Sequence, residues 1–588
     1  MSGSSRVFWS SSSRRWRIRS VLLLWGALLQ GLSLAPSTAK AQVFEPDDPV
    51  RVDPDRRSLS SAPEFRSLSK YYDYFENAVG TPGRTGGAAM NVNTLAEVPR
   101  SSWYTPRHFY DPMSTVELKR GPNRDNAPDT SSTWRVVGGK AQGKAAGFQI
   151  VDGDGDRYLL KFDPKGHLEL ATGAEAVSTR LFYALGYHVP QNYLVRFHRD
   201  RLRPDPGATY ENPVGEEKPI TSAAIDRFLN QVPRYEDGSY RALASLFIEG
   251  TPLGPFQYFG VRPDDPNDLF PHEMRRELRG LRVFAAWVNH DDARSANSLD
   301  VFVEEDGRRH VRHYLLDFGT TFGGGPGGPK PLWPGQEYIL EPDRILLSTL
   351  TLGIAGRPWR AAGIPTLPAV GSFDAEYFDP TTWRPQYYNP AFRNMDADDA
   401  FWAAKQVAHF TRDDLRALVE TGRYSHTATV DYLTRTLVSR RDKIARAYLP
   451  HGGGLGRFRV QNEALVFEDF LDHPAFNGQY VDASTTVAWH RFDNQNGQRT
   501  ETLGTTTVNG SRVSLPSSSA QYVVAVLRRP DVGPGTTEVF LRRTRTGREV
   551  VGIRRTAEGL PSTPPTWTVI LDGSPSPSSP PPTVSTER

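Results

Sequence analysis

Residues 289–297 read Asn-His-Asp-Asp-Ala-Arg-Ser-Ala-Asn, and residues 315–319 read Leu-Leu-Asp-Phe-Gly. Asp292 and Asn297 stand in an Asp-x4-Asn spacing, which lets the aspartate hold an incoming hydroxyl group while the asparagine turns back toward a metal ion. The residues before Asp317 are apolar and predict a strand. Asp317 itself would supply the second metal ligand. Together the two motifs predict magnesium-assisted phosphoryl transfer from ATP.

A lysine on a predicted strand and a glutamate on the following predicted helix precede these motifs, at Lys161 and Glu175. Residues 157–161 predict a short apolar strand, and residues 169–185 place apolar side chains at helical spacing. In kinases an ion pair between such a lysine and such a glutamate holds the lysine against the nucleotide phosphates. We therefore expect Lys161 and Glu175 to pair, and Lys161 to bind ATP.

A glycine-rich basic stretch comes before the strand: residues 138–147 read Gly-Gly-Lys-Ala-Gln-Gly-Lys-Ala-Ala-Gly. Glycines let backbone N–H groups approach phosphates closely. Lys140 and Lys144, on either side of Gly143, add positive charge. The stretch predicts that Lys140, Gly143 and Lys144 bind the nucleotide, although it is not the G-x-G-x-x-G loop of ordinary protein kinases.

Each motif alone also has an ordinary structural interpretation, because Lys161 could lie on the surface and Glu175 on a solvated helix face. Their order is more informative, since the glycine loop, lysine, glutamate, Asp-x4-Asn and Asp-Phe-Gly follow one another as in a kinase. This order predicts an α+β fold with a small β-rich lobe that contains one helix, and a larger helical lobe. Four stretches with helical spacing would build the larger lobe: residues 275–290, 400–410, 411–420 and 430–449.

The sequence around Asp292 is similar to that of a known family. Residues 292–299, Asp-Ala-Arg-Ser-Ala-Asn-Ser-Leu, follow Trp287-Val-Asn and precede the predicted strand that leads to Asp317. This run resembles the catalytic loop of HipA-like serine/threonine kinases and, more loosely, of phosphatidylinositol-kinase-like folds. The helix end and connection at residues 181–190 also look like theirs, and the resemblance covers about residues 134–449.

The resemblance implies a catalytic role for Asp292 and magnesium binding by Asn297 and Asp317. ATP would be the phosphate donor, and the acceptor would be an unidentified hydroxyl group on a protein or a small molecule. Two features differ from the family pattern. The loop before Lys161 is longer and carries lysines, and residues 323–328 are unusually rich in glycine where an activation loop would lie.

Several alternatives stay open at this stage. Asp291 competes with Asp292 for the catalytic role, although only Asp292 has the required spacing to Asn297. His290 could orient the loop backbone, or it could be a buried structural histidine. The same residues could transfer AMP instead of phosphate, and the chain could be a catalytically inactive scaffold protein of the cell envelope that kept a kinase-like fold.

Residues 1–41 have the three parts of a signal peptide. Residues 14–19 are cationic, residues 21–35 are apolar, and residues 39–41 read Ala-Lys-Ala, which is typical of a cleavage site. Because the apolar stretch is short and Pro36 follows it, we expect cleavage after residue 41 rather than a membrane anchor. We therefore expect export to the periplasm or the extracellular space, and the arginine pair in the cationic part partly matches a twin-arginine signal.

The remaining composition divides the chain further. The predicted segments after the signal peptide are an extended arm (42–133), the small lobe (134–230), the large lobe (231–450), a β domain (457–572) and a disordered Pro/Ser-rich tail (573–588), with a glycine-rich linker at 451–456. Alternating apolar and polar residues between turn signals indicate the β domain. It would bind a glycan or a protein, or stabilise the rest of the chain.

Cysteine is absent from the 588 residues, which excludes disulfides, thiolate zinc sites and a cysteine nucleophile. The 70 basic and 67 acidic residues give a net charge of +3. Such a balance does not favour nucleic acid or an anionic membrane as the main partner. We expect no nucleic-acid partner and no stable membrane span after signal cleavage.

Overall fold

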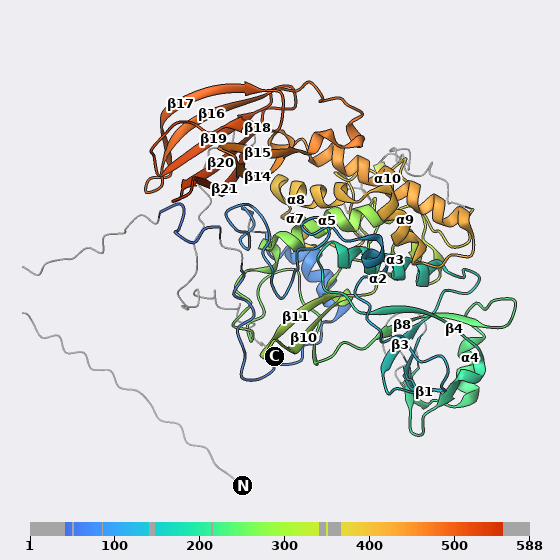
Figure 1. Ribbon diagram of the computed structural model, residues 1–588. Coiled ribbons are helices and arrows are strands. Elements are labelled where there is room, and N and C mark those ends of the chain that lie inside the picture. Colours follow the sequence, from blue (N-terminus) through green and yellow to red (C-terminus); the bar gives the residue numbers. More distant parts are fainter. Residues whose placement is uncertain are drawn as a thin grey trace, which may run out of the picture. The chain divides into compact units, whose positions relative to one another are not determined.

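The computed structural model describes residues 42–49, 52–84, 86–139, 147–212, 216–339, 349–350 and 366–556 (Figure 1). The predicted signal peptide (1–41) and tail (573–588) lie outside these residues. The described part of the chain combines helices with several β-sheets, so the fold class is α+β, as the sequence predicts.

A six-stranded sheet follows the N-terminal arm. Its strand order is β4-β8-β3-β2-β1-β5, and only β1 and β5 pair in parallel. The strands are β1 (Trp134–Gly139), β2 (Gly147–Val151), β3 (Arg157–Lys161), β4 (Asn192–Phe197), β5 (Leu202–Pro204) and β8 (Tyr240–Leu246). Because β8 lies between β4 and β3, the sheet extends past residue 230, the predicted end of the small lobe.

Two helices accompany this sheet among the described residues up to 230, where the sequence predicts one. The expected helix is α3 (Leu170–Ala184), and the additional one is α4 (Ser222–Leu229). The side chain of Thr221 caps α4 by accepting a hydrogen bond from the backbone N–H of Ala224. A short hairpin, β6 (Thr209–Glu211) and β7 (Glu217–Pro219), precedes α4.

A three-stranded antiparallel sheet positions the two predicted metal ligands. It consists of β9 (Thr251–Gly254), β10 (Ser298–Glu305) and β11 (Arg308–Leu315), in the order β11-β10-β9. Ser298 pairs with Leu315 in the register of β10 and β11. Asn297 and Asp317 therefore lie at the same end of this hairpin. A small hairpin of β12 (Gly324–Gly325) and β13 (Gly328–Pro329) follows.

Helices α5 (Arg276–Val288), α7 (Pro390–Arg393), α8 (Ala397–His409), α9 (Arg412–Glu420) and α10 (Thr427–Tyr448) share the largest hydrophobic core of the described residues. Helices α5, α8 and α10 pack on one another (Figure 1). Trp287 of α5 lies fully buried in this core, and its indole N–H donates to the carbonyl of Leu437 on α10 at 2.9 Å. The helices predicted at 275–290, 400–410, 411–420 and 430–449 are all present.

Strands and short 3-10 helices make up residues 455–556, with a hydrophobic core of their own. One sheet has the order β14-β15-β18 and the other β17-β16-β19-β20-β21. The strands are β14 (Leu455–Gln461), β15 (Ala464–Asp469), β16 (Thr485–Asp493), β17 (Gln498–Val508), β18 (Arg512–Ser514), β19 (Tyr522–Arg528), β20 (Thr536–Arg543) and β21 (Arg548–Thr556). The predicted linker at 451–456 is not exposed, because Gly452, Gly453 and Gly454 lie buried.

The arm contains little regular structure. Within residues 42–133, α1 (Lys70–Phe75), a five-residue π-helix after it, and α2 (Thr115–Arg120) are the helices described. Trp103 and Tyr104 lie buried in the hydrophobic core that the helices share, and Tyr104 also pairs with Tyr187 after α3. Trp103 stacks on His313 of β11 with ring centroids 3.5 Å apart. The arm is therefore part of the core and not only a covering.

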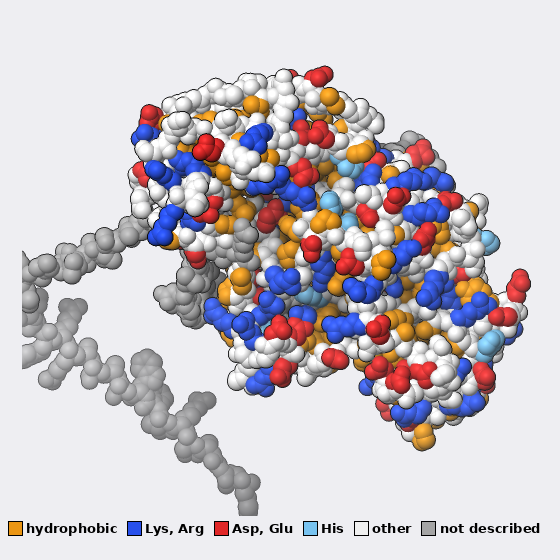
Figure 2. All heavy atoms as spheres, viewed as in Figure 1, with side chains coloured by type: hydrophobic (Ala, Val, Ile, Leu, Met, Phe, Trp, Pro, Cys, Tyr) orange, Lys and Arg blue, Asp and Glu red, His pale blue; other side chains and the backbone are white. Residues whose placement is uncertain are grey.

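The surface matches the balanced composition. Lys and Arg side chains alternate with Asp and Glu side chains over the face shown in Figure 2. Among the residues that the structure describes, no helix is both long and apolar enough to span a bilayer.

Candidate active site

Lys161, at the end of β3, binds two carboxylates at once. Its Nζ atom donates to Glu175 Oε1 on α3 at 2.5 Å and to Asp317 Oδ1 at 3.0 Å. Burial lowers the pKa of Lys161, but the charges of Asp317 and Glu175 outweigh this effect and raise the pKa above its ordinary value. Lys161 therefore stays protonated, and its charge joins Glu175 of α3 to Asp317, which lie far apart in the sequence.

Helix α3 presents Glu175 to Lys161 because its N-terminus is fixed. The buried Asp163, two residues after Lys161, accepts hydrogen bonds from the backbone N–H groups of Ala171 and Thr172, each at 2.8 Å. These are orphan donors of the first helical turn, so the contact acts as a cap supplied from the preceding loop. The carboxylate of Glu175 is almost fully buried, with 3% of its side chain exposed.

The loop after α5, residues 289–297, is folded back on itself. Helix α5 ends at Asn289, whose left-handed backbone (φ 53°) turns the chain. Asn297 Nδ2 donates to the backbone carbonyl of Asp292 at 2.8 Å and to Asp292 Oδ2 at 3.0 Å. The Asp-x4-Asn spacing therefore brings the two side chains together. Asn297 uses its amide hydrogens in these bonds, which leaves Oδ1 as the atom that would act as the predicted metal ligand.

The Asp292 carboxylate lies in a largely buried but charged environment. Arg294 Nε lies 2.9 Å from Asp292 Oδ1, and Asp292 exposes 14% of its side chain. Burial raises the pKa of Asp292, while the positive charges of Arg294 and Lys330 oppose that rise. A raised carboxylate pKa suits a group that accepts a proton from an alcohol in the reaction.

Asp291 is occupied elsewhere. Its carboxylate is fully buried and accepts hydrogen bonds from Lys330 Nζ and from Gln386 Nε2. A carboxylate held in this way has no exposed oxygen for an acceptor. The geometry thus favours Asp292 over Asp291 for the catalytic role, in agreement with the spacing to Asn297.

The Asp-Phe-Gly segment adopts a strained backbone. Asp317 has φ 60° and ψ 61°, a left-handed conformation uncommon for a non-glycine residue. The ring of Phe318 stacks on Phe182 of α3, with centroids 4.7 Å apart. A Cβ atom on Gly319 would lie 3.3 Å from Glu175 Oε2. The segment is therefore packed closely against α3, and Asp317 reaches Lys161 from there.

His290 is a buried, neutral histidine. Burial, followed by the charge of Lys330, lowers its pKa to about 3. Its ring lies 5.4 Å from that of Phe318, and its Nδ1 atom has no hydrogen-bond partner among the described residues. Of the two interpretations left open by the sequence, these contacts favour the structural one.

The donor atoms of Asn297 and Asp317 fit a hard divalent cation. The backbone N–H of Leu316 donates to the carbonyl of Asn297 at 2.9 Å, which holds both residues at one place. Amide and carboxylate oxygens are ligands that Mg²⁺ prefers, usually with only one or two protein groups and the rest from phosphate and water. Among the described residues there is no group of three His, Cys, Asp or Glu side chains that could hold a metal ion.

The predicted phosphate-binding residues Lys140, Gly143 and Lys144 lie outside the described residues. The strands on either side of them, β1 and β2, pair antiparallel, and β2 pairs with β3, which carries Lys161. The strands before and after these residues therefore belong to the sheet that carries Lys161. The role of Lys140, Gly143 and Lys144 stays a prediction.

The sequence analysis did not predict two charged residues of the site, Arg294 and Lys330. Arg294 lies within residues 289–297, two positions after Asp292. This closeness in sequence to Asp292 is the signal that could have identified it. Lys330 follows the glycine-rich stretch 323–328 and reaches Asp291 across 39 positions of sequence. No local pattern indicates that contact.

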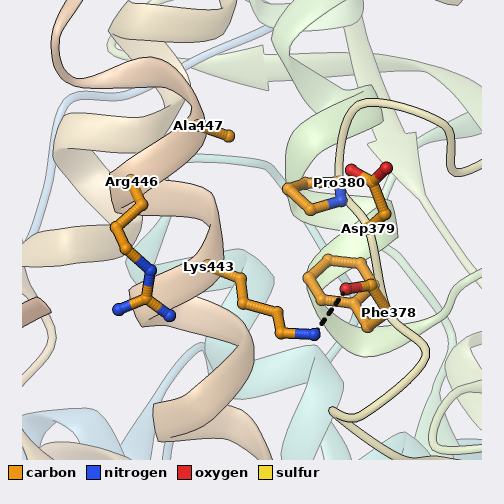
Figure 3. Close-up of a pocket in the computed structure, with 6 residues that line it drawn as sticks. All are labelled: Phe378, Asp379, Pro380, Lys443, Arg446 and Ala447. Carbon is orange, nitrogen blue, oxygen red and sulfur yellow. Dashed lines mark hydrogen bonds between the residues drawn. The ribbon is translucent and has the colours of Figure 1, made fainter.

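An open pocket elsewhere does not belong to this site. It has a volume of about 370 Å³ and lies between α10 and residues 378–380 (Figure 3). Lys443 Nζ donates across it to the carbonyl of Phe378 at 3.0 Å. None of its lining residues is among the residues that surround Lys161 or Asp292.

Comparisons with known proteins gave weak matches. No protein-family model and no curated protein matches the sequence. The chain has weak structural similarity to a crystal structure of the Golgi casein kinase, with a TM-score of 0.28 and 9% identity over 68% of this chain and 94% of that one. A crystal structure of the Golgi casein kinase with Mn/ADP bound gives a TM-score of 0.26 and 11% identity, over 68% and 95%.

Proposed function

We propose that this protein is an ATP-dependent phosphotransferase with a two-lobed, kinase-like arrangement. The observation that carries the proposal is the double contact of Lys161 with Glu175 at 2.5 Å and Asp317 at 3.0 Å. A buried lysine shared by a helix glutamate and a metal-binding aspartate is the arrangement that orients nucleotide phosphates in kinases. A purely structural ion pair would not need the second carboxylate on a strained backbone.

The residues divide the work of the reaction. Lys161 orients the donor phosphates, and Asp292 receives the acceptor hydroxyl group. The acceptor oxygen forms a bond to the γ-phosphorus, the bond from that phosphorus to the bridging oxygen of ADP breaks, and the acceptor proton passes to Asp292. Arg294, 2.9 Å from Asp292, adds positive charge where the phosphoryl group moves.

A divalent cation is part of this proposal. Asn297 and Asp317 would hold it, and when bound it supplies charge neutralisation for the transferring phosphoryl group. Magnesium is our first choice, because both ligands are hard oxygen atoms.

The wider context of the activity is also a proposal. We expect export of the mature chain from residue 42, toward the periplasm or the extracellular space, and membership of the HipA-like group of kinase folds. The acceptor is an unidentified hydroxyl-bearing molecule. The C-terminal strands (455–556) would form a separate β domain that binds a glycan or protein ligand.

The test is ADP formation from ATP by purified protein, with and without Mg²⁺ and a mixture of hydroxyl acceptors that includes water. The wild type should release ADP only with the divalent cation. Asp292→Asn should lower the rate by at least about 100-fold, because it removes the proton acceptor. The matched control is Asp379→Asn in the pocket of Figure 3, which should keep the wild-type rate. An Asp292→Asn variant as active as the control would contradict the assignment.

A further inference from the structure

Lys330 is a buried lysine that joins two parts of the proposed active site. Its side chain is 9% exposed, and its Nζ atom donates to Asp291 in the loop 289–297. The same Nζ atom donates to the backbone carbonyl of Thr320 at 3.1 Å, three residues after Asp317. Lys330 therefore holds the loop that carries Asp292 against the segment that carries Asp317.

We propose that Lys330 is a positioning residue for phosphoryl transfer, which sets the place of Asp292 relative to Asp317 by holding the neighbouring Asp291. This inference rests on the function proposed above and deepens it. Lys330 does not touch the reacting atoms. It acts through Asp291, the residue next to Asp292 in the chain, so a shift of Asp291 moves the catalytic carboxylate as well.

The position of Lys330 explains why residues 323–328 are rich in glycine. A Cβ atom on Gly325 would lie 3.1 Å from the Cγ atom of Lys330, so a side chain there would obstruct the lysine stem. Gly323 has φ +72°, and a Cβ atom on it would lie 2.2 Å from the backbone N of Ser372. The backbone N–H of Lys330 donates to the carbonyl of Gly323 at 2.8 Å. The glycines let the chain turn tightly enough to bring Lys330 back to the catalytic loop.

The contact is energetically important because both partners are buried. The Asp291 carboxylate is fully buried, and Gln386 provides its other described side-chain donor. Removing Lys330 would leave a buried negative charge with a neutral amide as its remaining described partner, which is strongly unfavourable. Asp291 would then shift toward water, and this movement would displace the neighbouring Asp292.

The test separates nucleotide binding from turnover in the Lys330→Met variant. The described hydrogen bonds of the Lys330 side chain go to Asp291 and Thr320 and not to Lys161, so we expect the Kd for Mg-ADP to change by less than about threefold. We expect the kcat of ATP turnover to fall at least tenfold, because Asp292 is misplaced. Lys330→Arg, which keeps the charge, should recover part of the rate. Wild-type kcat in Lys330→Met would overturn the inference.

The matched control is Lys405→Met. Lys405 of α8 is also buried and pairs with a single carboxylate, that of Glu97, which belongs to the arm. This variant should lose stability but keep its kcat once folded. If it lost kcat as strongly as Lys330→Met, the effect would be general loss of packing and the inference would fail.

Two further measurements distinguish failure of this inference from poor folding of the variant and from failure of the proposed function. The double variant Lys330→Met/Asp291→Asn removes both buried charges, so it should fold better than Lys330→Met while its kcat stays low. A double variant with wild-type kcat would overturn the positioning role. Absence of Mg-ADP binding in the wild type would contradict the proposed function itself, and it would be seen before any variant is compared.

Discussion

At the scale of single residues, burial and charge decide the state of each site group. Lys161 stays protonated because Asp317 and Glu175 outweigh the effect of burial on its pKa. His290 stays neutral because burial dominates and Lys330 adds to it. Asp292 has a raised pKa since its neighbours only partly compensate for burial. The site therefore holds a fixed cation, a neutral ring and a carboxylate poised to take a proton.

His290 should make stability depend on pH in the acidic range. Its pKa falls from 6.5 in the unfolded chain to about 3 in the fold, so the unfolded state binds more protons between these values and unfolding becomes easier as pH falls from 6.5. The unfolding free energy of the wild type should fall when the pH is lowered from 6.5 to 4.5. We predict that this fall is smaller in His290→Phe, by up to about 2.5 kcal/mol. Urea unfolding at both pH values measures it.

The control for this measurement is His198→Phe, because His198 is exposed. It should show the wild-type pH dependence. If His290→Phe lost stability on acidification as steeply as the wild type, His290 would not be a neutral residue in the fold.

The sequence indicated the contacts between residues of recognisable motifs better than the contacts of residues outside them. The pairing of Lys161 with Glu175 could be expected, because motif order and spacing place them in a known arrangement, whereas the direct contact of Lys161 with Asp317 was not predicted. The choice of Asp292 over Asp291 also followed from spacing. The contact of Lys330 with Asp291 could not be predicted, because it depends on how residues 323–328 turn in three dimensions.

At the scale of elements, α3 is held on several sides. Arg180 Nε donates to the carbonyl of Lys119 at the end of α2 at 2.6 Å. Ser178 and Thr321 share a hydrogen bond of 2.8 Å between their hydroxyl groups. Gly173 faces Tyr424, in the connection between α9 and α10. These contacts fix the helix that carries Glu175 and so fix the ion pair with Lys161.

Gly173 allows the close approach of α3 to Tyr424. A Cβ atom there would lie 2.5 Å from the Cε1 atom of the tyrosine ring. Alanine gains about 1 kcal/mol in helix propensity, but overpacking of a tight contact loses about 1–3 kcal/mol. We therefore predict that Gly173→Ala lowers stability by up to about 2 kcal/mol in urea unfolding, and weakens Mg-ADP binding because Glu175 moves with the helix.

The control is Gly510→Ala, since no atom lies within 4 Å of the added Cβ and its backbone needs no left-handed conformation. It should change stability by less than about 0.5 kcal/mol. A Gly173→Ala variant that is as stable as this control and binds Mg-ADP normally would show that α3 can move without loss of the site.

Element prediction failed where local signals were weak. Strand β8 reads Tyr-Arg-Ala-Leu-Ala-Ser-Leu, which lacks β-branched residues, and it forms a strand because it is enclosed between β3 and β4. By contrast, β3 and α9 have clear signals. The apolar residues of β3 form a strand as predicted, and α9 begins with a capping box of Thr411 and Asp414 close to the predicted start at residue 411.

At the scale of the whole described chain, the N-terminal arm ties distant parts together. Its buried Phe44 packs on Phe492 and Phe540 of the C-terminal sheet, with ring centroids 5.9 and 5.1 Å away. Thr94 of the arm accepts a hydrogen bond from the backbone N–H of Ile553 in β21 at 2.8 Å. Composition predicted an extended arm, but not these partners, because they lie more than 400 positions away in sequence.

Phe44 should therefore stabilise the C-terminal strands from the other end of the chain. We predict that Phe44→Ala lowers the unfolding free energy of the region 485–556 by about 3–4 kcal/mol, as expected for a fully buried phenylalanine. Hydrogen exchange of backbone amides measures the effect, which should be largest in β16, β19 and β20. Equal loss of protection around Lys161, or none in these strands, would contradict the role given to Phe44.

The most direct test of the proposed nucleotide site is thermal unfolding of residues 42–588 with and without ATP and Mg²⁺. A ligand that binds only the folded state raises its apparent stability. We predict that ATP with Mg²⁺ raises the Tm, that either alone raises it much less, and that Asp317→Ala abolishes the difference. The matched control is Asp306→Ala, another aspartate with positive φ (51°), in the turn between β10 and β11, which should keep the full shift. No nucleotide-dependent shift in the wild type, or the same shift in Asp317→Ala, would contradict the assignment of Lys161, Glu175, Asn297 and Asp317 to an ATP site.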